Sequence, residues 1–268
     1  MEDGIFDGKV AVVSGATRSM GAALVRRLSA DGAAVVGLGR SDSGETIARQ
    51  VRDAGGRAIF VPTDLTSEHA VRAAVDTAVA EFGRVDIVVN NAAASDVLRG
   101  GGERPVADEP TEVFDRLMKV NVYGPFFLAK YTLPHMVAAG GGALVGVSSI
   151  SAHRVYRSSP GYATSKAALE GLSRQIAVDY AEHGIRSNII VLGSIHSAET
   201  AATFADPVRN AARRNNRMIA DPATVEDVAE LVTFLASPAS RYITAALVPL
   251  DGGALATYPG PVASRTSS

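Results

Sequence analysis

Residues 10–21 read Val10-Ala11-Val12-Val13-Ser14-Gly15-Ala16-Thr17-Arg18-Ser19-Met20-Gly21, and this stretch decides the fold. The β-branched run at its start is typical of a buried strand. Beyond it, apolar residues recur at helical spacing up to Gly32, a good C-cap. A glycine-containing turn between strand and helix lets the backbone approach a pyrophosphate, which the helix N-terminus then stabilises. The stretch predicts a strand, a phosphate-binding turn and a helix; a tight connection that binds nothing is the alternative.

The same alternation continues along the chain. Short apolar runs predict seven strands, over Val10–Val13, Ala33–Leu38, Ala58–Val61, Ile87–Val89, Ala143–Val147, Asn188–Val191 and Leu247–Leu250. Their apolar character is expected of parallel strands that are covered on both faces. Strand–helix alternation with right-handed crossovers gives a single-domain α/β Rossmann fold, with a doubly wound, seven-stranded parallel sheet and helices on both faces. We assign this domain to residues 1–256 and a flexible tail, rich in Pro, Gly, Ser and Thr, to residues 257–268.

Two segments fall outside this rhythm, residues 94–110 and 194–218. Both follow predicted strands, so we expect them at the carboxyl edge of the sheet, where open α/β folds bind ligands, and we predict that they form the substrate loops. Arg209, Arg213, Arg214 and Arg217 make the second segment basic; a solvated helix face is the first interpretation and steering of an anionic substrate the second. After it, the pattern Thr224-x-x-Asp227 predicts the start of a late helix.

Composition narrows the class of protein. The 268 residues are 47% hydrophobic and 20% charged, and a net charge of −2 gives no reason to expect a nucleic-acid or membrane partner. There is no cysteine, which excludes disulfides, thiolate nucleophiles and cysteine-ligated metals. The five histidines show no metal-ligand spacing, so we predict no catalytic metal. No stretch resembles a signal peptide or a membrane span, and we expect a cytoplasmic protein.

The end of the second predicted strand addresses the choice of dinucleotide. It reads Gly37-Leu38-Gly39-Arg40-Ser41, without the Asp or Glu that would bind the ribose 2′-hydroxyl of NAD. Arg40 stands there instead, and Arg18 lies in the first turn. Two converging guanidiniums suit a 2′-phosphate, which accepts bidentate charge-assisted hydrogen bonds. The sequence therefore favours NADP(H) over NAD(H), although each arginine taken alone is an ordinary surface residue.

A second cluster of residues suits proton transfer. Tyr162 and Lys166 are an i, i+4 pair on one face of a predicted helix, and Ser149 precedes them by thirteen residues. An ammonium beside a phenol stabilises the phenolate, so we expect a lowered Tyr162 pKa. Such a phenol can exchange a proton with a carbinol oxygen near neutral pH, and Ser149 can hydrogen-bond the same oxygen. Taken alone, the pair is better explained as an exposed tyrosine beside a solvated lysine.

Further short motifs follow in a recognisable order. They are Asp64-Leu65, Asn90-Asn91-Ala92-Ala93, Asn121, Ser149, Tyr162, Lys166, the segment with Gly193, Ile195 and Ser197, and a final Asp251-Gly252-Gly253. With Ser14, Gly15, Ser19 and Gly21 at the first turn, the chain resembles the short-chain dehydrogenase/reductase family over nearly its whole length. It departs from the family pattern at Ser14 for Thr, Ser19 and Ala93 for Gly, and Leu192 for Pro. The Ser19 Cβ and hydroxyl stand where backbone meets the diphosphate, so we expect cofactor binding with altered affinity.

The resemblance implies a catalytic set of Asn121, Ser149, Tyr162 and Lys166. In it Tyr162 is the general acid or base, Lys166 lowers its pKa and binds the nicotinamide ribose, Ser149 polarises the substrate oxygen, and Asn121 holds a water that links Lys166 to solvent. The implied cofactor contacts are Gly15, Thr17, Arg18, Ser19, Met20, Gly21, Arg40, Ser41, Asp64, Leu65, Asn91, Ala92, Tyr162, Lys166, Gly193, Ile195 and Ser197.

The expected function is an NADP(H)-dependent oxidoreductase acting on a ketone, an aldehyde or a secondary alcohol. The family commonly assembles as homotetramers, and a dimer is the second expectation. Two other classes use the same scaffold. A non-catalytic NADP(H)-binding regulator would usually lack the Tyr or the Lys, and a dehalogenase or lyase would be expected to lack the nucleotide turn and Lys166; both features are present.

Overall fold

The computed structural model describes residues 4–94, 96–97, 102–207, 210–211, 214 and 216–257. Parts of both expected substrate loops therefore lie outside the described residues, as do Arg209, Arg213 and residues 258–268 of the expected tail.

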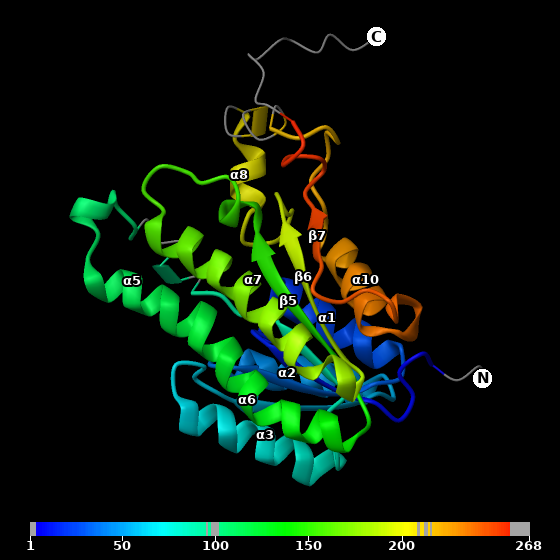
Figure 1. Ribbon diagram of the computed structural model, residues 1–268. Helices are drawn as coiled ribbons and strands as arrows, with labels where there is room; N and C mark the ends of the chain where they lie inside the picture. The colour runs from blue at the N-terminus through cyan, green and yellow to red at the C-terminus, as the bar shows by residue number, and fades with distance from the viewer. Residues whose placement is uncertain are drawn as a thin grey trace.

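A seven-stranded parallel sheet runs through the molecule in the order β3-β2-β1-β4-β5-β6-β7 (Figure 1). Its strands are β1 Val10–Ser14, β2 Ala34–Gly39, β3 Arg57–Pro62, β4 Ile87–Asn90, β5 Gly142–Ser149, β6 Ile185–Leu192 and β7 Leu247–Leu250. Every neighbouring pair is parallel. The predicted doubly wound α/β fold is confirmed.

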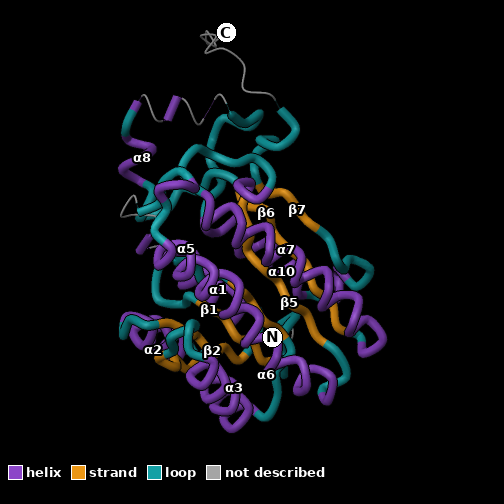
Figure 2. The backbone as a smooth tube through the Cα atoms, turned by 60° about the vertical axis from the view of Figure 1, so that its left-hand side comes forward, coloured by secondary structure: helices purple, strands orange, loops and turns teal. Residues whose placement is uncertain are grey.

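Helices cover both faces of this sheet (Figure 2). On one face α1 (Ser19–Ala30), α2 (Ser43–Asp53) and α10 (Val225–Ala236) supply the apolar side chains that pack on β1, β2 and β5. On the other face, α3 (Glu68–Phe82), α6 (Gly124–Ala138) and α7 (Pro160–Tyr180) do the same. Two apolar cores, one on each side, hold the layers together.

The sixth strand begins three residues before the sequence pattern predicts it. Arg186 interrupts the apolar run, but its guanidinium donates to the carbonyl oxygens of Leu235 and Ser237 at the end of α10. These carbonyl groups at the helix end satisfy the Arg186 guanidinium, whose burial in a strand would otherwise be unfavourable. The start of α10 is as predicted, because Thr224 and Asp227 form a reciprocal capping box.

The junction between α5 (Thr111–Met118) and α6 is a short π-helix, Lys119–Tyr123. Such π turns occur mostly as single interruptions of α-helices, often at functional sites. Asn121 lies in this turn and is buried.

The segment after β6 leaves the sheet and returns to it at a fixed point. Ile195 forms an isolated parallel bridge with Ala223, and the His196 N–H donates to the Ala223 carbonyl over 2.8 Å. Between these points lies α8 (Ala201–Ala205). Farther on, the N–H groups of Met218 and Ile219 both donate to the Gly252 carbonyl, which ties the segment to the turn after β7.

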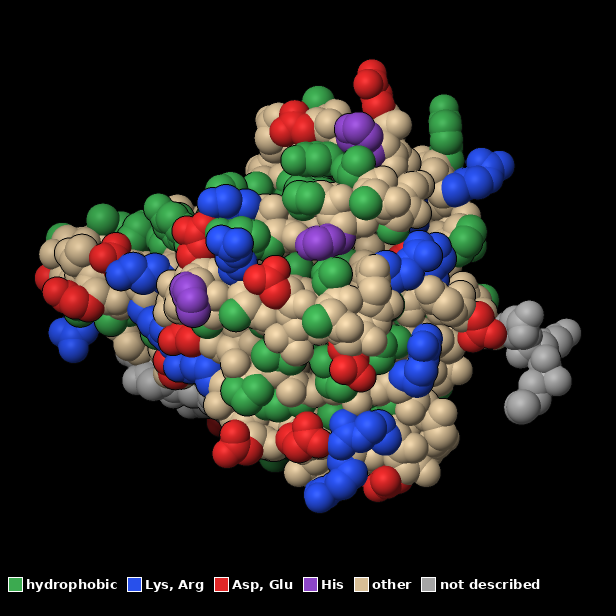
Figure 3. Space-filling model, turned by 90° about the horizontal axis from the view of Figure 1, so that it is seen from below, with side chains coloured by type: hydrophobic (Ala, Val, Ile, Leu, Met, Phe, Trp, Pro, Cys, Tyr) green, Lys and Arg blue, Asp and Glu red, His purple; other side chains and the backbone are tan. Residues whose placement is uncertain are grey.

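The surface is mixed in charge. Seen from below, acidic and basic side chains are interspersed without a field of one sign (Figure 3), in keeping with the small net charge of −2. Within the described residues, the helices are too short or too polar to cross a lipid bilayer.

Candidate active site

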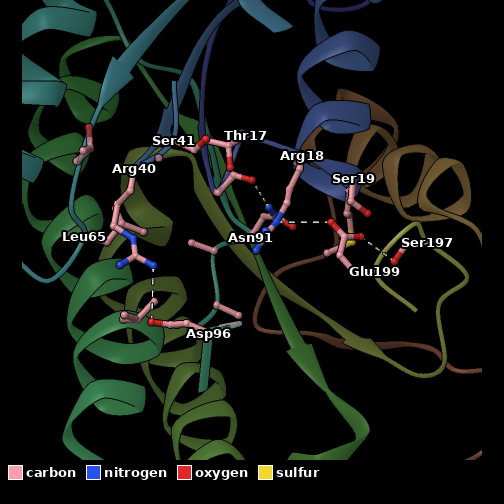
Figure 4. A pocket seen from close by; sticks show the side chains of 18 of the residues that line it. Thr17, Arg18, Ser19, Arg40, Ser41, Leu65, Asn91, Asp96, Ser197 and Glu199 are labelled. Carbon is pink, nitrogen blue, oxygen red and sulfur yellow. Dashed lines mark hydrogen bonds and ion pairs between the residues drawn. The ribbon is translucent and has the colours of Figure 1, made fainter. Parts of the chain in front are cut away.

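A cleft of about 610 Å³ opens at the carboxyl ends of β1, β2 and β4 (Figure 4). Fourteen of the expected cofactor residues line it: Gly15, Thr17, Arg18, Ser19, Met20, Gly21, Arg40, Ser41, Asp64, Leu65, Asn91, Ala92, Ile195 and Ser197. Gly193, Tyr162 and Lys166 are not among its lining residues. The residues that sequence reasoning missed are Gly39, Thr63, Ala93, Asp96, Arg116, Val120, Glu199 and Thr200.

The turn after β1 has room only for glycine at two positions. Gly15 has φ +70°, and a Cβ there would lie 2.9 Å from the Ala92 Cα. A Cβ on Gly21 would lie 1.9 Å from the Gly15 carbonyl oxygen, which lets α1 pack directly on the turn. The departure at Ser14 is conservative because only the hydroxyl is used: its Oγ accepts the N–H groups of Asn91 and Ala92.

The departure at Ser19 has a structural cost. Ser19 begins α1 with φ +44°, in the left-handed region that favours glycine. Its hydroxyl hydrogen-bonds Glu199, which also accepts from Ser197 Oγ over 3.0 Å and pairs with Arg18 over 3.5 Å. Burial alone would raise the pKa of Glu199, but these partners hold it below its usual value. A carboxylate of the segment after β6 therefore contacts expected cofactor residues, among them Arg18 and Ser197 (Figure 4).

Asparagines at the end of β4 complete the floor of the cleft. Asn91 Nδ2 donates to the carbonyls of Ser14 and Gly15, which fixes the turn, while Asn91 Oδ1 is buried and has no partner among the described residues. A buried acceptor without a donor is costly unless a ligand supplies one. The glycine cradle, the N-terminus of α1 and this acceptor together fit the diphosphate and ribose hydroxyls of a dinucleotide.

The two arginines expected to converge do not meet. Arg40 points to Asp96 over 3.8 Å, whereas Arg18 points to Glu199 on the other side of Asn91 (Figure 4). The expectation of a joint Arg18–Arg40 site is thus wrong, because each guanidinium is held by a different carboxylate. The second guanidinium near Arg40 is Arg116 of α5, which pairs with the same Asp96 over 3.5 Å. No pattern in the sequence connects Arg116 to this site.

Ser149, Tyr162 and Lys166 come together beside the cleft. Ser149 lies close enough to the Tyr162 phenol to lower its pKa as a hydrogen-bonding neighbour, and Lys166 Nζ lies 5.8 Å from the centroid of the Tyr162 ring. Tyr162 packs on the small core of Ala94, Leu117 and Val120, and Val120 also lines the cleft. The three residues predicted for proton transfer therefore lie together at the border of the cleft; their role in proton transfer stays a prediction.

Its electrostatics differ from the sequence expectation. Burial raises the pKa of Tyr162, the hydrogen bond with Ser149 lowers it in part, and the Glu103 charge raises it further. Burial also lowers the pKa of Lys166 to about 8, which the nearby Glu170 opposes. Lys166 Nζ donates to the Val147 carbonyl over 2.8 Å, so its charge is shared with the backbone. The expected lowering of the Tyr162 pKa by Lys166 is wrong for this structure.

Asn121 connects the π turn to the same cluster. Its Oδ1 accepts the Ala94 N–H and its Nδ2 donates to Ser165 Oγ, each over 3.0 Å. Ser165 in turn donates to the Tyr162 carbonyl. The side chain thus ties the end of β4 to the helix that carries Tyr162 and Lys166. That it also holds a water next to Lys166 stays a prediction.

The basic residues of the second segment differ in exposure. Arg217 is buried and donates to the carbonyls of Ile219 and Ala220, so it belongs neither to a solvated helix face nor to a surface that steers ligands. Arg214 is exposed, which fits either interpretation. In the portion of the chain that the structure covers, no three His, Asp or Glu side chains are grouped so that they could hold a metal ion.

Comparison with known proteins shows which family this chain belongs to. A family model described as enoyl-(acyl carrier protein) reductase matches residues 15–254. The cis-4-hydroxycyclohexanecarboxylate dehydrogenase of Sinomonas cyclohexanicum is 38% identical over 248 residues, 92% of this chain and 97% of that protein.

Two solved structures share the fold and carry a cofactor. A putative NAD(P)-dependent gluconate 5-dehydrogenase from Beutenbergia cavernae, with bound NADP, is 31% identical with a TM-score of 0.85, covering 94% of this chain and 98% of its own. Carveol dehydrogenase from Mycobacterium avium, in complex with NAD, is 26% identical with a TM-score of 0.86, covering 95% of this chain and 100% of its own.

Proposed function

This chain belongs to the short-chain dehydrogenase/reductase family, and we propose that it is an NADP(H)-dependent alcohol dehydrogenase or ketone reductase. The dehydrogenases that it resembles are named for substrates that carry hydroxyl or carbonyl groups. The observation that carries the proposal is the grouping of Ser149, Tyr162 and Lys166 at the border of a cleft lined by the expected dinucleotide residues.

The cofactor would bind along the carboxyl edge of the sheet. The backbone of residues 15–21 and the N-terminus of α1 would hold the diphosphate, and Asn91 Oδ1 would accept a ribose hydroxyl. Arg40, with Arg116 close by, supports a 2′-phosphate, since β2 ends without a carboxylate. When bound, the nicotinamide supplies or accepts the hydride.

The chain's own residues would handle the proton. In reduction, the Tyr162 hydroxyl gives its proton to the substrate oxygen, and in oxidation the phenolate takes it back. Ser149 Oγ would donate to the same oxygen and orient it. A raised pKa keeps the Tyr162 phenol protonated at neutral pH. Lys166, with its pKa of about 8, would still be mostly charged at neutral pH.

The substrate class is an alicyclic secondary alcohol or the matching ketone. Two observations support it: the named activity of the Sinomonas relative, and the exposed apolar side chains of Val155, Tyr156 and Met218 on the segments that follow β5 and β6. We propose residues 94–110 and 194–218 as the parts of the chain that contact this substrate.

Tyr162→Phe tests the assignment. We expect turnover with cis-4-hydroxycyclohexanecarboxylate, cyclic diketones or steroid ketones to fall by about a thousandfold or more, since the proton donor is lost. NADPH binding, measured by fluorescence titration, should change less than threefold. An active Tyr162→Phe enzyme would refute the role of Tyr162.

The same panel tests the alternative, a non-catalytic NADP(H)-binding regulator. Such a protein would be stabilised by NADPH but would oxidise none of it with any carbonyl compound.

We further propose a cytoplasmic homotetramer whose residues 1–256 form one domain. Exposed apolar residues on α6 and α7, including Phe126 and Val178, support the assembly.

A further inference from the structure

The helix that carries Tyr162 begins with a cap from a distant part of the chain. Pro160 at the first position of α7 has no N–H, and the side chain of Ser159, at the N-cap position, bonds none of the helix N–H groups. Instead, Glu103 Oε1 accepts the N–H of Gly161 over 2.8 Å and the N–H of Tyr162 over 3.0 Å. The Ala163 N–H reaches the Ser159 carbonyl. The first turn is therefore satisfied only because Glu103 is there.

The packing around Glu103 is built for this contact. Its other oxygen, Oε2, accepts from Ser159 Oγ over 3.3 Å. A Cβ on Gly161 would lie 3.3 Å from Glu103 Oε1 and 2.7 Å from a methyl of Leu117, so the absence of a side chain lets the carboxylate reach the helix. A carboxylate at a helix N-terminus also interacts favourably with the helix dipole.

We propose that Glu103 is a positioning residue for the reaction: it fixes the first turn of α7 and places a negative charge at the helix N-terminus, against the backbone of Tyr162. The inference rests on the proposed function of Tyr162. Its consequence is that one side chain of the segment between β4 and α5 sets both the location and the proton affinity of the acid–base group. Because that charge opposes ionisation of the phenol, it keeps Tyr162 in the protonated form up to a higher pH.

Other charges face the same cluster and must stay constant in a test. They are Lys166 on α7, Glu170 and His153 behind it, and the Asp96–Arg116 pair on the side of α5.

Glu103→Gln separates charge from position. The amide oxygen can accept the same two N–H groups, so kcat should fall less than in Glu103→Ala, but the charge is gone. We expect the acid limb of kcat/KM for alcohol oxidation with NADP⁺ to move to lower pH by roughly 0.5 unit or more, because less repulsion opposes the phenolate. Glu103→Ala removes the cap as well and should lose kcat by tenfold or more. Glu112→Gln, an exposed carboxylate in the first turn of α5, is the matched control and should leave the profile in place.

A second measurement needs no substrate. The ultraviolet difference between Glu103→Gln and Glu103→Gln/Tyr162→Phe reports the ionisation of Tyr162 alone, and it should occur at lower pH than in the matching wild-type pair. Identical titrations and superimposable pH profiles for wild type and Glu103→Gln would overturn the inference. If Tyr162→Phe is inactive and Glu103→Gln is unshifted, this inference alone fails. If Tyr162→Phe is active, the proposed function fails first and takes this inference with it.

Discussion

Arg40 is the residue that we propose decides between NADP(H) and NAD(H). It lies 3.8 Å from Asp96, so a bound 2′-phosphate would have to replace that carboxylate as its partner. Burial raises the pKa of Asp96, but backbone hydrogen bonds and the charges of Arg116 and Arg40 more than offset this, and the group is ionised at neutral pH. Selectivity therefore reflects a competition between two anions for one cation.

Replacing Arg40 by Asp should reverse the preference. We expect kcat/KM with NADPH to fall at least tenfold, about 1.4 kcal/mol, and that with NADH to rise, because the new carboxylate repels the phosphate and accepts a ribose hydroxyl. Steady-state rates with both cofactors measure the ratio. Asp96→Asn is the companion variant and should favour NADPH further. An unchanged ratio in Arg40→Asp would place phosphate recognition elsewhere.

Lys166 gives the molecule a stability that depends on pH. Its pKa is about 8 in the folded protein, against an ordinary 10.5, so the unfolded chain holds more of this proton between these values. The free energy of unfolding should therefore rise as pH increases from 8 to 10.5, by up to roughly 3 kcal/mol. Below pH 8 Lys166 is charged in both the folded and the unfolded protein, so the folded protein carries the full free-energy cost of burying the ammonium.

Lys166→Met removes this proton and should remove this rise. Urea unfolding of wild type and variant between pH 7.5 and 10.5 measures this rise. The difference between the two stability curves isolates Lys166, because every other titrating group contributes to both. We expect wild type to gain on the variant as pH increases, while the variant loses turnover at all pH values. Parallel curves would show that the Lys166 ammonium is no costlier folded than unfolded.

At the scale of the element, the first turn of α1 carries a strained residue. Ser19 adopts φ +44° although it has a Cβ, and its hydroxyl bonds Glu199 in compensation. Ser19→Gly should raise the free energy of unfolding by about 1 kcal/mol, since glycine adopts this conformation freely. It should also bind NADPH several-fold more tightly, because the backbone can approach the diphosphate.

Ser19→Ala is the matched control. It keeps the Cβ and loses the hydroxyl, so it should show no gain in stability. Urea unfolding and NADPH titration of both variants measure these effects. Equal stability of the Gly and Ala variants would show that the strain costs little at this position.

Most elements follow from the sequence because local patterns decide them. The apolar run of β1, the glycine turn and the Thr224–Asp227 box of α10 each depend on neighbours in the chain. The site is less predictable, because its partners are distant. Asp96, Glu199 and Glu103 reach Arg40, Arg18 and the start of α7 only in the folded molecule, and no periodicity marks an acid that will meet a remote cation or N–H group.

For the whole molecule, exposed apolar side chains predict assembly. Tyr123 and Phe126 are 52% and 44% exposed beside one another at the start of α6, and Val178 is exposed on α7. An exposed apolar patch on a folded chain often marks a contact with another chain. Phe126→Glu should lower the mass measured by light scattering from that of a tetramer to a smaller species. Thr77→Glu, on the exposed side of α3, should not. A monomeric wild-type protein would refute the assembly.

The segment after β6 is fixed to the sheet at both of its ends, and this has an evolutionary consequence. Ile195 and Ala223 are joined at the sheet, and Gly252 holds the chain again at residues 218 and 219. Residues between these anchors can be lengthened or exchanged as a cassette without pulling on the strands, because doubling the length of such a loop costs only about 0.6 kcal/mol of closure entropy. Descendants of this chain could thus acquire new substrates by exchanging the part of this segment that follows Thr200, while the residues that line the cleft stay as they are.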